Sequence, residues 1–427
     1  MLELISVKGF RSLRDFSLEI RSGLNVLVGP NGAGKTNIIL FFDFFRNVTM
    51  GSLADGVGRA GGVAQVFSKR GKNSFADKIQ ASINGRVKVD KITYVYSYKF
   101  EIQFSSARQE VFFSRQELLI EEAAQEVDKK VFGLHLIYRQ PGVEEGSSLE
   151  ILKNSLHKKN SWVINELKAL SDHKFYAQQC FFSFLVHADE VCSAVSDDFS
   201  GRFILNVVPS HVKKPEDSTR KPGIDTDGSG LSATLYAIKK GRSFYDRSVS
   251  ARPRKTRITP LNPQWNGLID LIRVAVPSIT DIDVENDPFD NLLRCRISVG
   301  KGNRKAVLPL SALSDGTVKW MSLVARLLTS REALLLEEPE NYLHPLMQRE
   351  IVRLLRGSVD GAGFMLVSTH SETLLNAVKP EELVLVSYDG SGTKAKRASN
   401  SIGVAEEINR TGFGLGYYYL ADALEAE

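Results

Sequence analysis

An eight-residue run near the N-terminus has the residue types and spacing needed to bind phosphate. The pattern G-x-x-x-x-G-K-[ST] is matched in full by Gly29-Pro30-Asn31-Gly32-Ala33-Gly34-Lys35-Thr36, with Asn37 directly after it. A mostly apolar run, 24–28, precedes it and a helix-like stretch, 37–45, follows, so backbone N–H groups can wrap a phosphate at the start of a helix. A glycine-rich turn with a chance lysine is the alternative, but both flanks agree with phosphate binding. We therefore predict that this segment binds a nucleoside triphosphate.

The two residues that close the motif have different expected roles. The ammonium group of Lys35 supplies a positive charge for the β- and γ-phosphates, and the hydroxyl of Thr36 is suited to bind Mg²⁺. ATP and Mg²⁺ are accordingly the expected cofactors.

A second chemical signal is an apolar strand that ends in two carboxylates. The run 333–336 is followed by Glu337 and Glu338, the position of a Walker B motif. Hydrolysis needs one carboxylate to hold the Mg²⁺ shell and another to orient or deprotonate the attacking water, so we assign Glu337 to the first role and Glu338 to the second. A purely structural strand end is the alternative for this motif taken alone.

Two further segments offer groups for the phosphates. Ser314 and Gly316 open a helix with an apolar stripe, where first-turn N–H groups and the positive end of the dipole can face an anion; a plain serine N-cap is the alternative. The strand 364–369 delivers His370 at its end, a candidate for a γ-phosphate contact, although a lone histidine is usually structural.

Composition limits the class of protein. With 427 residues, 25% charged and 43% hydrophobic, the chain fits a globular protein of two or three domains. No stretch approaches the roughly 20 apolar residues of a membrane span, and the N-terminus lacks a signal-peptide pattern. Three cysteines (Cys180, Cys192 and Cys295) without metal-type spacing fit a reducing cytoplasm, where we expect the protein to be located.

The elements that position these residues follow from periodicity. Residues 78–138 contain short strand-like runs, with Asn84-Gly85 as an expected hairpin turn, and predict an antiparallel subdomain. The range 161–195 is helix-like, and 176–186 is too apolar on all sides to be a free arm. Residues 310–386 alternate helix and strand patterns, as an α/β sheet requires. The segment 242–257 is basic, which fits either a solvated loop or a phosphate-binding surface.

The order of these motifs resembles the ABC-type ATPase heads of the RecF/SMC group. It is most similar to the AAA-labelled ATPases of bacterial defence systems, relatives of the overcoming-lysogenization-defect family. The resemblance rests on the P-loop, Leu313–Thr317, the run Glu337-Glu338-Pro339-Glu340-Asn341-Tyr342-Leu343-His344-Pro345, and Ser368-Thr369-His370, with support from 7–13 and 227–231. It covers residues 1–75 and 275–390.

The resemblance implies an α/β fold: an ABC-type P-loop ATPase head with an antiparallel β-subdomain and a mainly helical insertion. The expected division is an N-terminal part of the head at 1–150, the insertion at 151–275 and a C-terminal part of the head at 276–427. In that family two heads sandwich two ATP molecules, so the match implies that Ser314 and Gly316 reach the γ-phosphate of the facing subunit. By the same match Glu338 is the base, His370 the switch histidine, and Arg11 a basic residue near the nucleotide.

The chain also departs from the family pattern. Its signature ends Asp315-Gly316-Thr317 rather than Gly-Gly-Gln, and its metal carboxylate is Glu337 rather than aspartate. Too few residues follow His370 for the nuclease domain of the lysogenization-defect proteins, and the SMC-type coiled-coil arm is missing.

Three functions compete at this point. The first is an ATP-driven homodimer or higher homo-oligomer that senses or regulates a separate effector, a nuclease or toxin, in antiphage defence. The alternative is a DNA repair or recombination ATPase that clamps DNA; the net charge of +5 permits a polyanion partner without demonstrating one. A transporter subunit fits poorly because of the chain length and the absence of an apolar span.

Overall fold

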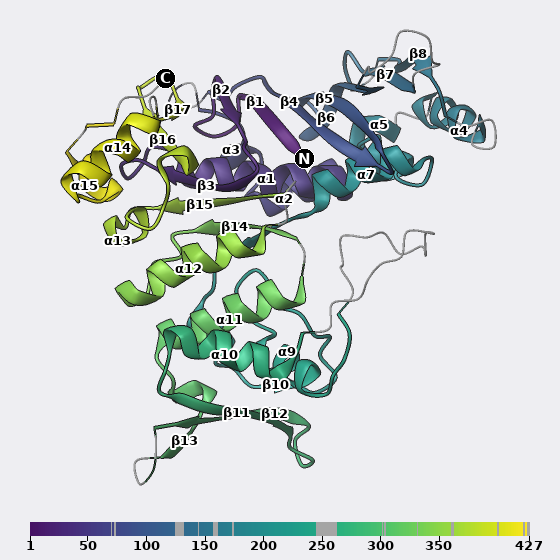
Figure 1. The fold of residues 1–427 in the computed structure, drawn as a ribbon. Helices are drawn as coiled ribbons and strands as arrows, with labels where there is room; N and C mark the ends of the chain where they lie inside the picture. Colours follow the sequence, from purple (N-terminus) through teal and green to yellow (C-terminus); the bar gives the residue numbers. More distant parts are fainter. Residues whose placement is uncertain are drawn as a thin grey trace.

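Two large β-sheets and one small sheet organise the fold (Figure 1). The structure is a computed structural model, and it describes all residues except 70, 72–73, 124–131, 144, 157–160, 173–174, 245–262, 301, 303–304, 331, 360–362, 399–400, 422 and 425–427. In the described part of the chain, no helix is long and apolar enough to cross a membrane.

The first sheet is antiparallel throughout and lies along the top of Figure 1. Its strands are, in spatial order, β2 (Phe16–Glu19), β1 (Leu2–Lys8), β4 (Lys78–Val89), β5 (Ile92–Ser105), β6 (Glu110–Glu122), β7 (Gly133–Arg139) and β8 (Ser148–Asn154). The antiparallel subdomain expected from the sequence is therefore confirmed.

The second sheet brings distant parts of the chain side by side. Its spatial order is β17 (Thr393–Arg397), β16 (Leu383–Tyr388), β3 (Gly23–Val28), β15 (Phe364–Thr369), β14 (Ala333–Glu337) and β9 (Arg202–Leu205). All neighbouring strands are parallel except β16 and β17. The carboxyl ends of β3, β14 and β15 consequently meet at one edge, and the predicted mixed α/β fold is confirmed.

Helices cover both faces of this second sheet. On the side of the antiparallel sheet lie α1 (Lys35–Met50), α2 (Leu53–Arg59), α3 (Val63–Val66), α4 (Ser161–Asp172), α5 (Phe175–Gln178), α6 (Phe182–Leu185) and α7 (Glu190–Ser200). On the other side lie α11 (Asp315–Thr329), which follows the 3₁₀ turn η3 (Leu310–Ala312), and α12 (Pro345–Ser358). The C-terminal part adds α13 (Glu372–Leu375), η4 (Pro380–Glu382), α14 (Ser401–Thr411) and α15 (Leu415–Leu420).

A lobe below α11 in Figure 1 completes the chain. It contains α8 (Pro209–Val212), α9 (Leu231–Lys239), α10 (Trp265–Ala275) and a small sheet of β10 (Glu216–Asp217), β12 (Leu292–Val299), β11 (Ile279–Asn286) and β13 (Ala306–Pro309).

Alternation along the central strands divides the interior into two cores. On β14, Leu335 packs with α1 and the antiparallel sheet, whereas Leu334 and Leu336 pack with α11 and α12. Because successive side chains of a strand point to opposite faces, a strand covered on both sides has to be apolar at every position. This requirement explains the unbroken apolar run before the two glutamates.

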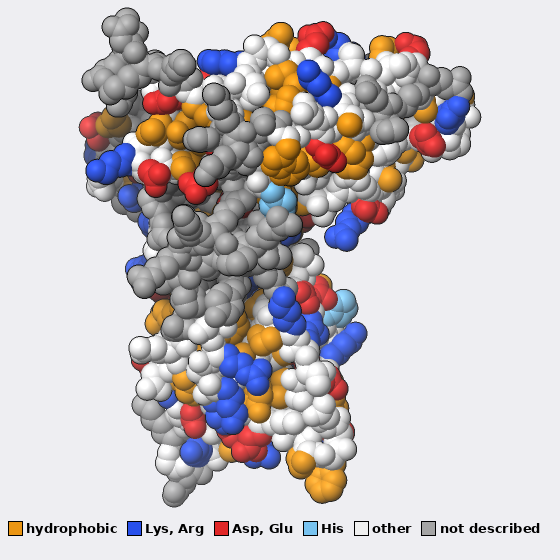
Figure 2. All heavy atoms as spheres, turned by 90° about the vertical axis from the view of Figure 1, so that its right-hand side faces the viewer, with side chains coloured by type: hydrophobic (Ala, Val, Ile, Leu, Met, Phe, Trp, Pro, Cys, Tyr) orange, Lys and Arg blue, Asp and Glu red, His pale blue; other side chains and the backbone are white. Residues whose placement is uncertain are grey.

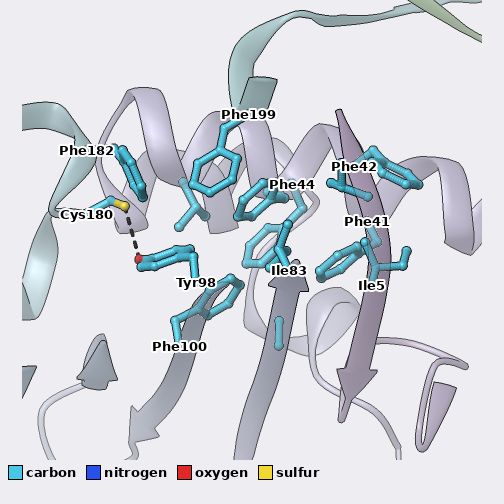
Figure 3. Close-up of a cluster of buried hydrophobic side chains, with 14 of the residues drawn as sticks. Ile5, Phe41, Phe42, Phe44, Ile83, Tyr98, Phe100, Cys180, Phe182 and Phe199 are labelled. Carbon is cyan, nitrogen blue, oxygen red and sulfur yellow. Dashed lines mark hydrogen bonds between the residues drawn. The ribbon is translucent and has the colours of Figure 1, made fainter. Parts of the chain in front are cut away.

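The first core is rich in aromatic residues from α1, β5 and α5–α7 (Figure 3). The ring of Phe199 lies 4.5 Å from that of Phe182 and 4.9 Å from that of Phe45, centroid to centroid, in edge-to-face arrangements. Tyr98, which is buried beside them, shares a hydrogen bond with the Sγ atom of Cys180 at 3.1 Å. The expectation that 176–186 packs inside is confirmed, because the apolar side chains of this range, including Tyr176 and Phe181, are buried except for the partly buried Phe184.

One turn predicted from the sequence is wrong. Asn84-Gly85 lies inside β4, which continues to Val89 and pairs with β5 throughout. A Cβ on Gly85 would collide with the Tyr96 hydroxyl and the Met1 carbonyl oxygen, so glycine is needed here for a close approach and not for a turn. The chain reverses instead at Asp90, whose φ is 54°.

The range 151–275 is mainly helical, but it also belongs to the central architecture. It supplies β9, whose residues 202–205 pair in parallel with residues 333–336 of β14. The same range includes α4–α7 on one side of the sheet and α8–α10 on the other. The domain boundaries given above therefore remain a prediction.

The aromatic core supports a prediction about stability. Phe199→Ala removes a buried ring from contact with Phe45 and Phe182 and should lower the free energy of unfolding by about 3–5 kcal/mol. Phe289→Ala is the matched control, because Phe289 is 98% exposed on the β11–β12 turn and its loss should change stability by less than about 0.5 kcal/mol. Urea denaturation followed by circular dichroism measures both, and equal losses would contradict the packing described here.

Candidate functional site

The predicted phosphate-binding loop joins β3 to α1 at the carboxyl edge of the central sheet. Gly32 and Gly34 have φ values of 79° and 103°, the left-handed region that favours glycine. Gly34 is the N-cap of α1 and no side chain caps this helix end, so the first-turn N–H groups are free to receive an anion. Asn31, Gly32 and Thr36 are exposed along the loop, and Ala33 is buried beneath it.

Lys35 lies across the inside of this loop. Its ammonium group donates to the carbonyl oxygens of Gly29 at 2.8 Å and Pro30 at 3.1 Å, and the residue is only 6% exposed. Burial lowers the pKa of Lys35, while the nearby charges of Glu338, Glu340 and Glu337 act to raise it. The loop therefore holds one cation next to three carboxylates.

Thr36 and Glu337, the two residues predicted to bind the metal, are in direct contact. The Thr36 hydroxyl donates a hydrogen bond to Oε1 of Glu337 across 301 residues of sequence. A hydroxyl and a carboxylate oxygen at one point are hard oxygen ligands, the type that Mg²⁺ accepts alongside phosphate oxygens and water. The residues present thus fit the ion. The described residues contain no cluster of three or more His, Cys, Asp or Glu that could hold a metal by itself.

Residues that the sequence analysis did not identify fix the loop from behind. The Thr393 hydroxyl donates to the carbonyl oxygen of Ala33 at 2.9 Å and lies 2.7 Å from the Ser12 hydroxyl. Asn37 donates its side-chain amide to the same Ser12 hydroxyl at 2.7 Å. A Cβ on Gly34 would collide with Thr393. The only sequence signal for Thr393 is its position after a Gly-rich turn in β17's hairpin, which does not indicate this contact.

Glu338 follows β14 in an unusual backbone conformation. Its φ of 41° lies in the left-handed region, which a non-glycine residue enters at a cost of about 1–3 kcal/mol. Its N–H donates to the carbonyl oxygen of Ser368 at 3.0 Å, and its Oε2 accepts from the Asn341 side chain at 3.1 Å. The other carboxylate oxygen lies 3.6 Å from Nε2 of His370. Strain at a residue with two such contacts is typical of functional sites.

His370 lies beside this carboxylate at the end of β15. Its side chain is 32% exposed. Burial and the positive charge of Lys35 lower the pKa of His370, which Glu338 and Glu340 act to raise. The structure therefore brings Lys35, Thr36, Glu337, Glu338 and His370 together, as the sequence analysis expected, although their individual roles remain predictions.

A buried lysine on α11 also belongs to this region and was not identified from the sequence. Lys319 donates to the carbonyl oxygens of Glu338 at 3.3 Å and Asn341 at 3.1 Å. Burial lowers the pKa of Lys319 to about 8, while Glu340 and Glu338 act to raise it. From the sequence, a lysine beside Trp320 in a helix would be expected to face solvent. Only the fold reveals its hydrogen bonds to the two carbonyl oxygens.

The signature segment begins α11. Ser314 is its N-cap and accepts a hydrogen bond from the Thr317 N–H at 3.2 Å, so the N-cap interpretation is confirmed. Gly316 packs against the next motif, because a Cβ there would collide with the carbonyl oxygen of Tyr342. Ser314 itself is exposed. The N-cap role does not exclude a contact with a second subunit, which remains a prediction.

Arg11 lies in the turn between β1 and β2, with a φ of 47°. Its guanidinium donates to the carbonyl oxygen of Ala60 at 2.7 Å, and burial lowers its pKa. It is the neighbouring Ser12 that reaches the phosphate-binding loop. A role for Arg11 near the nucleotide remains a prediction.

Comparison with known families agrees with this geometry. A family model described as "AAA ATPase domain" matches residues 1–197, and one described as "AAA domain, putative AbiEii toxin, Type IV TA system" matches residues 193–376. The chain is therefore similar to ATPase-domain models over two adjoining segments, each shorter than half of its length. The two matches together include the phosphate-binding loop, the signature segment, the paired glutamates and His370.

Individual relatives match this chain over short segments. The DNA double-strand break repair Rad50 ATPase of Methanopyrus kandleri is 49% identical over 39 residues, which are 9% of this chain and 4% of that protein. The chromosome partition protein Smc of Methanocaldococcus jannaschii is 50% identical over 38 residues, 9% of this chain and 3% of that protein. The match thus spans a small fraction of either relative's length.

Among solved structures, an Smc head bound to the C-terminal winged-helix domain of ScpA is similar with a TM-score of 0.47 and 14% identity, over 92% of this chain and 97% of that one. The SMC head domain from Thermotoga maritima gives a TM-score of 0.38 and 13% identity, over 93% and 99% of the two chains.

The position of Glu338 leads to the first prediction for the site. Glu338→Gln should keep ATP binding but lower turnover at least about 100-fold, because the amide cannot accept a proton from water while the phosphate loop is unchanged. Phosphate release measures turnover, and a fluorescent ATP analogue measures affinity. Hydrolysis at the wild-type rate would remove Glu338 from the mechanism.

A second prediction concerns the support of the loop. Thr393→Val preserves shape but removes the hydrogen bonds to Ala33 and Ser12, and should weaken ATP affinity about 5–10-fold by loosening the loop. Thr411→Val, which removes a hydroxyl bonded to the Glu407 carbonyl oxygen on α14, is the control and should bind ATP normally. Calorimetric titration compares the two, and equal affinities would show that the loop does not depend on Thr393.

Proposed function

We propose that this protein is an ATPase, an ABC-type head that dimerises head-to-head on ATP and regulates a separate effector, as part of antiphage defence. The observation that supports the proposal is that the hydrolytic motifs and the signature segment lie at separate places in one chain. The hydrolytic groups meet within one chain, whereas the exposed Ser314 bonds, in the described structure, only within its own helical turn.

In this proposal each chain performs defined steps. Bound ATP with Mg²⁺ would supply the triphosphate whose terminal phosphorus water attacks. Lys35 and the N–H groups at the start of α1 bind and neutralise the phosphates, and Thr36 with Glu337 holds the metal. Glu338 accepts a proton from the attacking water, and His370 donates a hydrogen bond to the γ-phosphate. Ser314 and Gly316 of the second subunit complete the phosphate contacts.

The regulatory part of the proposal has two supports. The family model over residues 193–376 is described as "AAA domain, putative AbiEii toxin, Type IV TA system", which favours a place for this protein in a multi-component system of that kind. In addition, Thr36 and Glu337, the groups suited to Mg²⁺, meet at the phosphate-binding loop, and the proposal assigns the effector chemistry to another protein. The effector is expected to be a nuclease or toxin.

The surface charge favours this proposal over a DNA clamp. Figure 2 shows lysine and arginine side chains on the lower lobe with acidic side chains close by. Lys213 pairs with Asp315, Lys239 with Asp283, and Arg294 with Asp290. A phosphate backbone would therefore meet a surface of mixed charge in this lobe, without the single-sign field that attracts a polyanion. Most of the basic segment 242–257 lies outside the described residues.

Ser314→Arg tests the dimer. It should leave ATP binding to one subunit within about 3-fold of wild type and abolish both ATP-dependent dimerisation and hydrolysis, because an arginine at the closing surface clashes only when two heads meet. Ser358→Arg is the control, since the exposed Ser358 ends α12, which runs back from the carboxyl edge to the opposite edge of the sheet. Sedimentation velocity with ATP and phosphate release provide the readouts.

Mixing the Ser314→Arg and Lys35→Ala variants sharpens this test. One of the two composite sites in the mixed dimer joins an intact loop to an intact signature, so activity should rise above that of either variant alone. If the Ser314→Arg variant hydrolyses ATP at the normal rate, Ser314 serves only as a helix cap. Stimulation by duplex DNA that falls steeply with salt would support the DNA-clamp alternative instead.

A further inference from the structure

A third glutamate, Glu340, follows Glu337, the proposed metal ligand, and Glu338, the proposed base. Oε1 of Glu340 accepts two hydrogen bonds, from the Thr369 hydroxyl at 2.6 Å and from the His370 backbone N–H at 2.8 Å. The donors end β15 and the acceptor follows β14, its parallel neighbour in the sheet. One carboxylate oxygen therefore joins the turn that carries Glu338 to the turn that carries His370.

The second oxygen of the same carboxylate argues against a role in stability alone. Oε2 of Glu340 is buried and has no hydrogen-bond partner among the described residues. A buried carboxylate oxygen without a partner costs free energy, and an apolar side chain of similar size would avoid that cost. Glutamate must therefore contribute something that an apolar side chain cannot, through its bonded oxygen or through its charge.

The bonded oxygen of Glu340 holds the backbone segment that carries His370. Thr369, which donates its hydroxyl to Glu340, also accepts from the Ser371 N–H at 3.0 Å. Ser371 in turn caps α13 by accepting from the Leu374 N–H at 3.2 Å. Glu340 is thus the anchor of a chain of hydrogen bonds through 369–371, and the His370 side chain is the exposed group that this fixed turn presents.

We propose that Glu340 is the positioning residue of the ATPase site, which fixes the His370 backbone relative to Glu338 so that imidazole and base keep one geometry during hydrolysis. This inference rests on the proposed roles of Glu338 and His370. Misplacement of a reacting group by about 1 Å can cost about 100-fold in rate, so two hydrogen bonds at this point are sufficient to matter for turnover.

The carboxylate also has a separable electrostatic effect. Its charge acts to raise the pKa values of Lys35, Lys319 and His370, in opposition to their burial. Glutamine retains an oxygen acceptor for Thr369 and His370 but removes the charge, whereas alanine removes both. Comparing the two substitutions therefore separates positioning from charge.

The experiment measures kcat, KM and ATP affinity for Glu340→Ala, Glu340→Gln and Thr369→Val. We expect Glu340→Ala to lower kcat about 30–100-fold with ATP affinity within about 3-fold of wild type. Glu340→Gln should restore kcat to within about 5-fold of wild type, and Thr369→Val, which removes one of the two bonds, should lie between. Glu350→Ala on α12 removes a surface pair with Arg353 and should be unchanged.

Several outcomes would overturn the proposal. A normal kcat for folded Glu340→Ala, or an equal loss in Glu340→Gln and Glu340→Ala, excludes positioning through the two hydrogen bonds. Additive losses in the Glu340→Ala, Thr369→Val double variant would also exclude it, since residues acting through one bond must be non-additive. If Glu340→Ala fails to fold by circular dichroism, the comparison of Glu340→Gln with Thr369→Val still decides, because a kcat for Glu340→Gln below that of Thr369→Val would contradict it.

A parallel measurement separates this proposal from the proposed function. Glu338→Gln should lose turnover whatever Glu340 does, because it removes the base itself. Wild-type hydrolysis by Glu338→Gln would reject the catalytic assignment, whereas loss in Glu338→Gln with no change in Glu340→Ala would reject only the positioning role.

Discussion

The coverage of the central sheet on both faces is the constraint on which the rest of the molecule depends. Because α1 lies on one face and α11 with α12 on the other, β3, β14 and β15 have to be apolar at almost every position. Polar chemistry is then confined to the strand ends. Parallel pairing places those ends at one edge, so the phosphate-binding loop meets the glutamates at the end of β14 and His370 after β15, although the loop is more than 300 residues away from them in sequence.

The turn after β14 keeps its shape at the carboxyl edge of the sheet at a cost in backbone strain. Glu338 adopts a left-handed backbone, and a non-glycine residue remains there only when its surroundings over-determine it. The N–H of Glu338 is fixed by Ser368, its carbonyl oxygen by Lys319 and its carboxylate by Asn341. Lys319 is itself buried, with its pKa lowered to about 8. The strained backbone of Glu338 is thus held in part by the buried Lys319. The backbone strain of Glu338 and the burial of the Lys319 charge each cost free energy, and the hydrogen bond between the two residues offsets part of both costs.

The sequence was sufficient where function imposes a local pattern and insufficient where contacts are long-range. The glycines and lysine of 29–36, the paired glutamates and His370 could be predicted, because phosphate and metal chemistry require fixed residue types at fixed spacing. Asn84-Gly85 was misinterpreted because a glycine needed for close approach has the same local signal as a turn. Thr393 and Lys319 could not be identified, since a hydroxyl on a hairpin and a lysine on a helix acquire their partners only from the fold. The role of β9 was hidden for the same reason, because four residues carry too little pattern to show which sheet they join.

The contacts of α11 connect the two halves of the proposed mechanism. Gly316 lies against the Tyr342 backbone, and one turn further along Lys319 holds the carbonyl oxygens of Glu338 and Asn341. The first turn of α11 therefore bears directly on the turn that carries the base. A rigid helix transmits a displacement of one end along its length, and close-packed interiors leave little room to absorb it. A displacement of the exposed Ser314 by a partner would consequently shift Glu338 of the same chain, through contacts that exist before any partner binds.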